Sequence, residues 1–157
     1  MATGSLPQEL KEVKRDGDRV LHSDDVLALR RPPQSMAIVR AGAIGVEFAT
    51  IFASLGTEVT LLEKMDRVVP SEDWEISDSL RRIMNRKGIR ILTGCSVVGL
   101  DGNGLEIQAA DGGGKIQAEK ILVAIGRRPR FRPEELNRLG VEFTARGILV
   151  DQRMGTN

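Results

Sequence analysis

The stretch from 36 to 63 constrains the fold more than any other part of the 157-residue chain. It opens with a short apolar run at 36–39 and closes with a β-branched, apolar run at 58–63, and both have the length of strands. Gly56 suits the end of a helix that would lie between the two runs. Apolar side chains recur there at the spacing of one helix face, namely Ile44, Phe48, Ile51, Phe52 and Leu55. The order of strand, turn, helix and strand predicts a βαβ unit.

The turn between the first strand and the helix is rich in small residues. Gly42 and Gly45 occupy the second and third glycine positions of a Gly-x-Gly-x-x-Gly fingerprint, and Arg40 stands at the first. In that fingerprint the first glycine makes the tight turn, the second lets the backbone approach a pyrophosphate, and the third allows close packing of helix on strand. We therefore predict that the amides of Gly42, Ala43, Ile44 and Gly45 bind a pyrophosphate at the helix N-terminus. The alternative is an ordinary tight turn without a ligand.

An acidic residue ends the second strand of this unit. Glu63 follows Gly45 by 18 residues (63 − 45), close to the ~20 expected of an acid that accepts hydrogen bonds from the adenosine ribose. This spacing predicts NAD in preference to NADP. In the alternative interpretation Glu63 is a solvated acid at a strand end, and the neighbouring Lys64 gives the site some tolerance for an extra phosphate.

The rest of the pattern predicts a three-layer α/β fold of the Rossmann-like type. We expect a second helix at 72–87, a short strand at 89–92, and an antiparallel β-meander of about 96–119, where two glycine-rich segments give strong hairpin signals. The apolar run at 120–125 should return to the parallel sheet. The expected sheet has about four strands, with the helices at 43–55 and 72–87 on one face and the meander on the other.

Several single residues have simple structural interpretations. A short strand or turn is expected at 19–21, followed by a helical turn at 23–29 that is capped by its own first residue. Ser71 is expected to cap the second long helix. Trp74 is expected to pack within that helix, and Cys95 to pack as a small apolar residue. His22 is the only histidine and has no acid or metal partner in its pattern, so a catalytic role is disfavoured.

Composition excludes several classes of function. Lys and Arg number 23 against 22 Asp and Glu, so the chain has no electrostatic footprint for nucleic acid or for an anionic membrane. A single cysteine cannot form an intramolecular disulfide, and no apolar run approaches the ~18 residues needed to span a bilayer. These features favour a soluble protein in a reducing compartment. We assign no catalytic and no metal-ligating residue.

Four motifs in order make the chain similar to a known family. They lie at 2–5, 42–49, 123–129 and 156–157. Together they resemble the NAD-binding domain of the flavin-dependent pyridine-nucleotide disulfide oxidoreductases, and among these the dihydrolipoamide (dihydrolipoyl) dehydrogenases. The resemblance implies a connecting segment from a flavin domain at 1–34, an NAD-binding domain at 35–129, and a segment returning toward the flavin domain at 130–157.

The resemblance also implies a larger parent enzyme. Such an enzyme is an oxidoreductase that passes electrons from a dithiol, through a redox-active disulfide and FAD, to NAD. This chain alone lacks the cysteine pair and the flavin site, so FAD is expected only in the complete parent. Expected partners are NAD(H), the remaining domains of the flavoenzyme and, through the parent, a 2-oxo acid dehydrogenase complex. The expected compartment is the cytoplasm for a bacterial parent and the mitochondrial matrix for a eukaryotic one.

Three further site residues follow from the resemblance alone. It implies that Ile44 and Glu47 face the nicotinamide end, and that Gly126 lets the chain pass close to nicotinamide and flavin. An acid near a helix N-terminus is stabilised there by the helix dipole with or without a ligand, so Glu47 also has a purely structural interpretation. Arg127 and Arg128 could hold phosphate or pair with acids at the surface.

Two alternatives to this functional assignment remain. In one, the domain folds but has lost nucleotide binding, because Arg40 places a long side chain where the family has no Cβ. In the other, the chain is the corresponding domain of a different NAD(P)H-dependent disulfide reductase or of an NADH oxidase.

Overall fold

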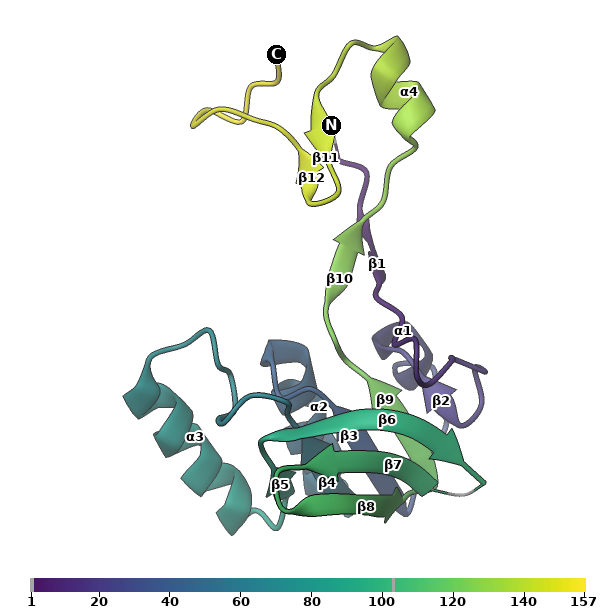
Figure 1. Cartoon of the computed structure of the whole chain (residues 1–157), viewed down its shortest axis with the longest axis vertical. Coiled ribbons are helices and arrows are strands. Elements are labelled where there is room, and N and C mark those ends of the chain that lie inside the picture. The colour runs from purple at the N-terminus through teal and green to yellow at the C-terminus, as the bar shows by residue number, and fades with distance from the viewer. Residues whose placement is uncertain (1, 103) are drawn as a thin grey trace. The chain divides into compact units, whose positions relative to one another are not determined.

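The computed structural model describes residues 2–102 and 104–157, and these form two compact units (Figure 1). One unit is Glu9–Gly126, and the other combines the residues up to Gln8 with Arg127–Asn157. Among the described residues, no helix is both long and apolar enough to cross a lipid bilayer.

A parallel sheet forms the centre of the larger unit. It has five strands in the order β2-β9-β3-β4-β5, and every neighbouring pair is parallel. Val39 lies opposite Leu62 on one side and Val123 on the other, so the three central strands end at the same level. The residues that follow these strands therefore line one edge of the sheet. The strands are β2 (Val20–Leu21), β3 (Ser35–Val39), β4 (Glu58–Leu62), β5 (Arg90–Leu92) and β9 (Lys120–Val123).

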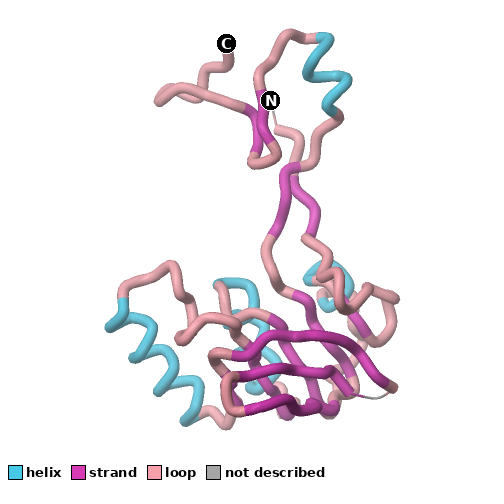
Figure 2. The backbone as a smooth tube through the Cα atoms, viewed as in Figure 1, coloured by secondary structure: helices cyan, strands magenta, loops and turns pink. Residues whose placement is uncertain are grey.

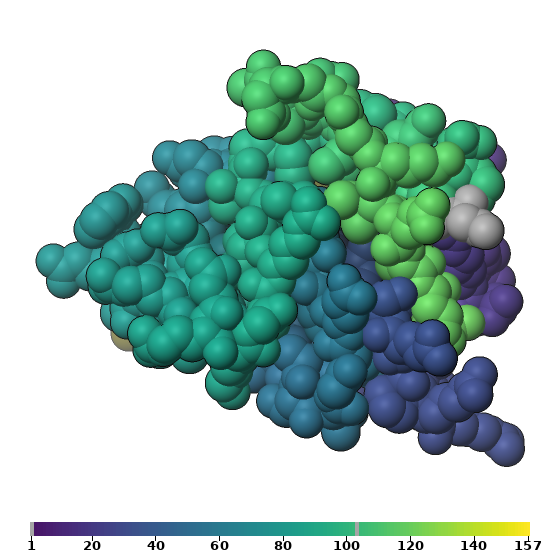
Figure 3. All heavy atoms as spheres, turned by 90° about the horizontal axis from the view of Figure 1, so that it is seen from below, coloured from purple at the N-terminus to yellow at the C-terminus, as the bar shows by residue number. Residues whose placement is uncertain are grey.

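Helices cover one face of this sheet and an antiparallel meander covers the other, which confirms the predicted three layers (Figure 2). The helices are α2 (Ala43–Ser54) and α3 (Trp74–Arg86). The meander consists of β6 (Cys95–Asp101), β7 (Gly104–Ala109) and β8 (Gly112–Gln117). In the view from below, α3 (teal) and β8 (green) occupy separate parts of the surface of this unit (Figure 3).

The strand period of two divides the core between these layers. Met36 and Ile38 of β3 pack in the cluster on the helix side, whereas Ala37 and Val39 pack in the cluster on the meander side. All four side chains are buried because both faces of the central strand are covered. This double burial explains why the sequence at 36–39 is continuously apolar.

Four details of the helices and strands differ from the sequence-based predictions. The sheet has a fifth strand, β2, which lies where a short strand or turn was expected in the connecting segment; its place in the parallel sheet was not predicted, because two residues are too few to give a periodic signal. Strand β8 begins at Gly112, and its three glycines pair with β7 where a turn was predicted. The N-cap of α3 is Asp73, whose carboxylate accepts a hydrogen bond from the amide of Glu75, and not Ser71. Trp74 begins α3 and is 64% exposed, so its predicted packing is wrong.

The buried face of α2 is also displaced from the predicted apolar stripe. Gly45, Val46, Ala49 and Phe52 are buried, whereas Ile51 and Leu55 are about half exposed. Small residues allow the helix axis to approach the sheet closely, so the face that carries them turns inward. Hydrophobicity alone does not reveal this preference.

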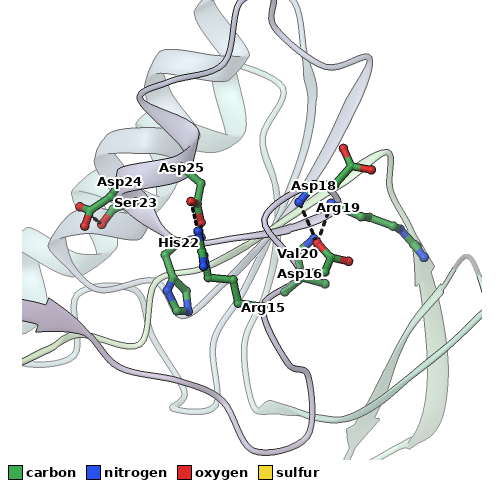
Figure 4. Close-up of polar contacts among 9 residues, drawn as sticks. All are labelled: Arg15, Asp16, Asp18, Arg19, Val20, His22, Ser23, Asp24 and Asp25. Atoms are coloured by element: carbon green, nitrogen blue, oxygen red, sulfur yellow. Dashed lines mark hydrogen bonds and ion pairs between the residues drawn. The ribbon is translucent and has the colours of Figure 1, made fainter.

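The segment before β3 is ordered by acidic side chains (Figure 4). One carboxylate oxygen of Asp16 accepts the amides of Asp18, Arg19 and Val20 at 2.8–2.9 Å. The short helix α1 (Ser23–Val26) is capped by His22 and not by Ser23, and the His22 amide donates to Asp25.

Asp25 also forms an ion pair with Arg15 (Figure 4). The hydrogen bond from the Arg15 guanidinium, together with the His22 amide and the charge of Arg15, lowers the pKa of the Asp25 carboxyl to about 2. Asp25 is therefore ionised throughout the neutral range, and its contacts hold the start of α1.

The smaller unit contains short elements. Strand β1 (Ser5–Pro7) pairs with β10 (Arg127–Pro129), and Arg127 donates hydrogen bonds to Ser5. The remaining elements are α4 (Pro133–Arg138), β11 (Phe143–Thr144) and β12 (Gly147–Ile148). The rings of Phe131 and Phe143 meet edge to face with their centroids 5.2 Å apart, and this contact joins the segment that leads into α4 to β11.

Candidate functional site

The candidate site lies at the carboxyl edge of the parallel sheet. Arg40 follows β3, Glu63 follows β4, and Ile125 lies two residues beyond β9. Backbone hydrogen bonds continue past the strand ends, since the amide of Arg40 donates to Leu62 at 2.7 Å and the amide of Ala124 donates to Val39 at 3.1 Å. These bonds hold the residues of the edge in fixed register.

Gly45 is required by the close packing of α2 on β3. A Cβ at this position would lie 2.0 Å from the carbonyl oxygen of Arg40, which is far inside van der Waals contact. This is the packing task of the third glycine in the fingerprint. Gly42, the N-cap of α2, differs because its φ is −76° and an added Cβ would meet nothing within 4 Å. The fold itself therefore leaves open space at Gly42, where the fingerprint allows a ligand to approach the backbone.

Arg40 occupies a backbone conformation that suits glycine. Its φ is +83°, in the left-handed region that costs a residue with a side chain about 1–2 kcal/mol. The turn at the first glycine position is thus retained although the glycine is absent. The side chain is exposed, and its guanidinium Nη1 donates a hydrogen bond to the carbonyl oxygen of Ile125 at 3.0 Å. Arg40 therefore links the ends of β3 and β9.

Glu63 is a buried acid with two backbone partners. Only 3% of the residue is exposed. One carboxylate oxygen accepts a hydrogen bond from the amide of Ala41 at 2.8 Å, and the other accepts one from the amide of Met65 at 2.9 Å. An ionised carboxylate has about four acceptor positions, so roughly two remain for a ligand. The solvated strand-end acid of the alternative interpretation does not match this burial.

A pocket of about 580 Å³ lies beside these residues. Arg40, Glu63 and Lys64 contribute its charged groups, together with Glu12. The volume is within the range of ordinary small-molecule sites. Its apolar wall includes Val39 and Leu62 from the sheet and Val97 from the meander.

Sequence reasoning missed the contribution of the meander to this pocket. Strand β6 brings Cys95 and Val97 against the sheet edge, and only its alternating apolar residues hint at a covered face. Cys95 is buried, its thiol donates to the carbonyl oxygen of Leu92 at 3.3 Å, and burial raises the pKa of that thiol. It packs as the small apolar residue that the sequence predicts.

The other predicted site residues do not line this pocket. Gly42, Ala43, Ile44 and Gly45 form the turn and the first residues of α2, and Glu47 is an exposed residue further along that helix. Gly126 follows Ile125 and has a φ of +108°. The structure therefore gathers Arg40, Glu63 and Lys64 into one pocket and leaves the remaining candidates along the same sheet edge. Within residues 2–102 and 104–157, no group of three or more His, Cys, Asp or Glu side chains is placed to hold a metal.

A parallel sheet with a glycine turn at its carboxyl edge, an acid after the next strand and a meander on the second face defines a Rossmann-like domain. Sequence comparison gives the family. The profile of the pyridine nucleotide-disulphide oxidoreductases matches residues 1–157, and the chain belongs to that family.

Relatives in the family share about a third of their residues with this chain. It is 37% identical to a dihydrolipoyl dehydrogenase of Bacillus subtilis, over 100% of this chain and 35% of the relative. It is 35% identical to a soluble pyridine nucleotide transhydrogenase of Mycobacterium tuberculosis, over 99% of this chain and 34% of the relative. The chain thus spans about a third of the length of these relatives.

Solved structures agree with this placement. An HOCl-induced flavoprotein disulfide reductase, RclA of Escherichia coli, superposes with a TM-score of 0.80 at 29% identity, over 98% of this chain and 36% of the reductase. LpdA of M. tuberculosis gives a TM-score of 0.81 at 26% identity, over 95% of this chain and 33% of that protein. The chain therefore has the fold of one part of a larger disulfide reductase.

Proposed function

We propose that this chain is the NAD(H)-binding part of a flavoenzyme similar to dihydrolipoyl dehydrogenase. The observation that carries the proposal is the buried carboxylate of Glu63, which is fixed 2.8 Å from the amide of Ala41, inside the glycine turn, and lines a pocket at the same edge. In the parent, NAD would accept the electrons that pass from a dithiol through a redox-active disulfide and FAD. FAD and the disulfide belong to the remaining domains.

Each site residue has a proposed task. The amides at Gly42, Ala43, Ile44 and Gly45 hold the pyrophosphate, because the N-terminal amides of a helix and its dipole favour an anion. Glu63 accepts hydrogen bonds from the ribose hydroxyls, which favours NAD over NADP. These residues bind and orient the cofactor, and none of them exchanges electrons.

Four residues have proposed tasks at the two ends of the cofactor. Lys64 supplies a positive charge at the rim of the pocket. Ile44 and Glu47 face the nicotinamide end, and Gly126 allows close passage of the backbone there. By resemblance, a 2-oxo acid dehydrogenase complex is the partner of the parent, and the bacterial cytoplasm or the mitochondrial matrix is its compartment.

A second candidate function is a domain with impaired nucleotide binding. The observation in its favour is Arg40, whose side chain takes the place of a missing glycine and is bonded across the edge to Ile125. A wider assignment to another NAD(P)H-dependent disulfide reductase or to an NADH oxidase draws support from the relatives named above. The parent's redox residues, outside this chain, distinguish those enzymes.

Calorimetric titration tests the first two possibilities. NAD⁺, NADH and NADP⁺ are titrated into the chain and into Arg40→Gly. We expect the unchanged chain to bind NAD⁺ and NADH weakly. Arg40→Gly should bind them at least tenfold more tightly, a difference of about 1.4 kcal/mol. Both proteins should bind NADP⁺ more weakly than NAD⁺. Met154→Gly is the matched control, because Met154 also has a positive φ, +62°, but lies outside the pocket.

Two results would contradict the proposal. If neither protein binds NAD⁺ or NADH, the site is not a dinucleotide site. If NADP⁺ binds as tightly as NAD⁺, Glu63 does not have the proposed role. Equal affinities of the unchanged chain and Arg40→Gly for NAD⁺ would show that the arginine is tolerated.

A further inference from the structure

We propose that Arg40 makes this site selective for nucleoside mono- and diphosphates over a complete dinucleotide. The inference rests on the proposed function, because it assumes that the pocket at Glu63 takes the nucleoside end of a nucleotide. It adds a specificity-determining residue and a ligand class that the glycine fingerprint does not predict.

The bond between Arg40 and Ile125 divides the carboxyl edge of the sheet. Arg40 follows β3 and Ile125 follows β9, and these strands are neighbours in the sheet. Glu63 lies beyond β4 on one side of this link, and Gly126 comes directly after Ile125 on the other. A dinucleotide whose halves reach both Glu63 and Gly126 has to cross the link. A ligand that ends at its phosphate group does not.

The pocket on the Glu63 side has the groups that such a short ligand needs. Val39, Leu62 and Val97 give an apolar wall for a base. Glu63 has free acceptor positions for ribose hydroxyls, as described above. Arg40 and Lys64 line the same pocket and supply two positive charges, which offset the carboxylates of Glu63 and Glu12 in the lining. The pocket therefore combines apolar, acceptor and cationic groups within about 580 Å³.

Phosphate chemistry adds a second reason for the preference. A terminal phosphate monoester carries about −1.5 to −2 charges at neutral pH and exposes three acceptor oxygens. A guanidinium binds such a group through two parallel hydrogen bonds. Each phosphate in the pyrophosphate of a dinucleotide carries a single negative charge and is esterified or bridged on both sides. It therefore offers Arg40 less charge and fewer acceptor oxygens than a terminal phosphate does. Only Nη1 of Arg40 is used in the bond to Ile125, so the N–H groups on Nε and Nη2 can bind a terminal phosphate while the link stays in place.

The conformation of Arg40 separates two possible obstacles to the dinucleotide. One is the Cβ of Arg40, which is present at a turn with a φ of +83° where the fingerprint has a glycine. The other is the guanidinium, which is bonded to Ile125 across the sheet edge. Arg40→Ala keeps the first obstacle and removes the second, whereas Arg40→Gly removes both. Arg40→Lys keeps a positive charge but cannot bind phosphate with a planar fork.

The test is the ratio of dissociation constants for NAD⁺ and ADP, measured by calorimetry on the full chain and the three variants. We expect the chain to bind ADP at least tenfold more tightly than NAD⁺. In Arg40→Ala this ratio should fall at least tenfold, because ADP loses its partner and NAD⁺ gains room, and Arg40→Lys should lie in between. Adenosine, which has no phosphate, should bind equally to the chain and to Arg40→Ala, and Met154→Gly should behave as the unchanged chain.

The outcomes distinguish this inference from the proposed function. If Arg40→Gly binds NAD⁺ but the ratio is the same in the chain and in Arg40→Ala, the proposed function stands and the selectivity of Arg40 is refuted. If the ratio changes only in Arg40→Gly, the Cβ is the obstacle and the guanidinium link is refuted. If no form binds NAD⁺, ADP or adenosine, both proposals are overturned.

Discussion

Replacement of Gly45 by alanine should strongly destabilise the larger unit. The added Cβ would lie 2.0 Å from the Arg40 carbonyl oxygen and 3.5 Å from Cγ2 of Ile38. The first contact has to open by at least about 1 Å, and the atom in the way belongs to the backbone. Since Arg40 is held by its bond to Leu62 at 2.7 Å, the helix must move away from the sheet.

The expected loss follows from opposing terms. Alanine within a helix is otherwise favoured over glycine by roughly 0.5–1 kcal/mol. Overpacking in a close-packed interior costs about 1–3 kcal/mol or more, and movement of α2 also loosens Ala49 and Phe52. We expect a net loss of about 2–3 kcal/mol in the free energy of unfolding. With a urea m-value of about 2 kcal/mol/M, the midpoint falls by roughly 1–1.5 M.

Urea unfolding followed by far-UV circular dichroism measures this loss. Gly42→Ala is the matched control in the same turn, because its Cβ meets nothing within 4 Å and its φ of −76° suits any residue. Its free energy of unfolding should stay within about 0.5 kcal/mol of the unchanged chain. Equal midpoints for Gly45→Ala and Gly42→Ala would refute the close-packing argument.

Two further predictions concern buried or paired acids. Glu63→Gln leaves one of the amides of Ala41 and Met65 facing an NH₂ group instead of an acceptor oxygen. It should lower the free energy of unfolding by about 1–3 kcal/mol in urea titrations and weaken NAD⁺ binding in calorimetry. An unchanged urea midpoint would contradict the two observed bonds. Asp25 has a pKa of about 2, below its ordinary 3.8, so its contribution to stability is full above pH 4 and disappears as the pH falls toward 2. Arg15→Met should therefore be slightly less stable than the unchanged chain at pH 7, with the two converging between pH 4 and pH 2 in thermal melts; a constant gap would show that the pair does not cause the shift.

The sequence predicts the local parts of this site well and the assembled pocket poorly. The strand, glycine turn, helix and second strand at 36–63 lie where the periodicity places them, because each depends on neighbouring residues. The positive φ of Arg40 also follows from the fingerprint, which reserves that position for glycine. The contribution of Val97 was not predicted, because it depends on how a meander packs against the sheet.

The inward face of α2 shows the same limit. A count of apolar residues favours Ile51 and Leu55, which the structure leaves about half exposed. Gly45 and Ala49 are less hydrophobic but smaller, and they let the helix backbone approach β3. The distance between two packed elements decides which face is buried, and that distance is absent from the pattern of a single helix.

The sequence by itself determined the family, the order of the elements and the chemical groups available at the carboxyl edge. These depend on residue type and on spacing along the chain. Only the tertiary structure decided how those groups are used. The carboxylate of Glu63 meets the amide of Ala41 across 22 residues, and the guanidinium of Arg40 meets the carbonyl of Ile125 across 85 residues. Contacts over such separations form only when the sheet aligns its strand ends, and local propensity carries no information about them.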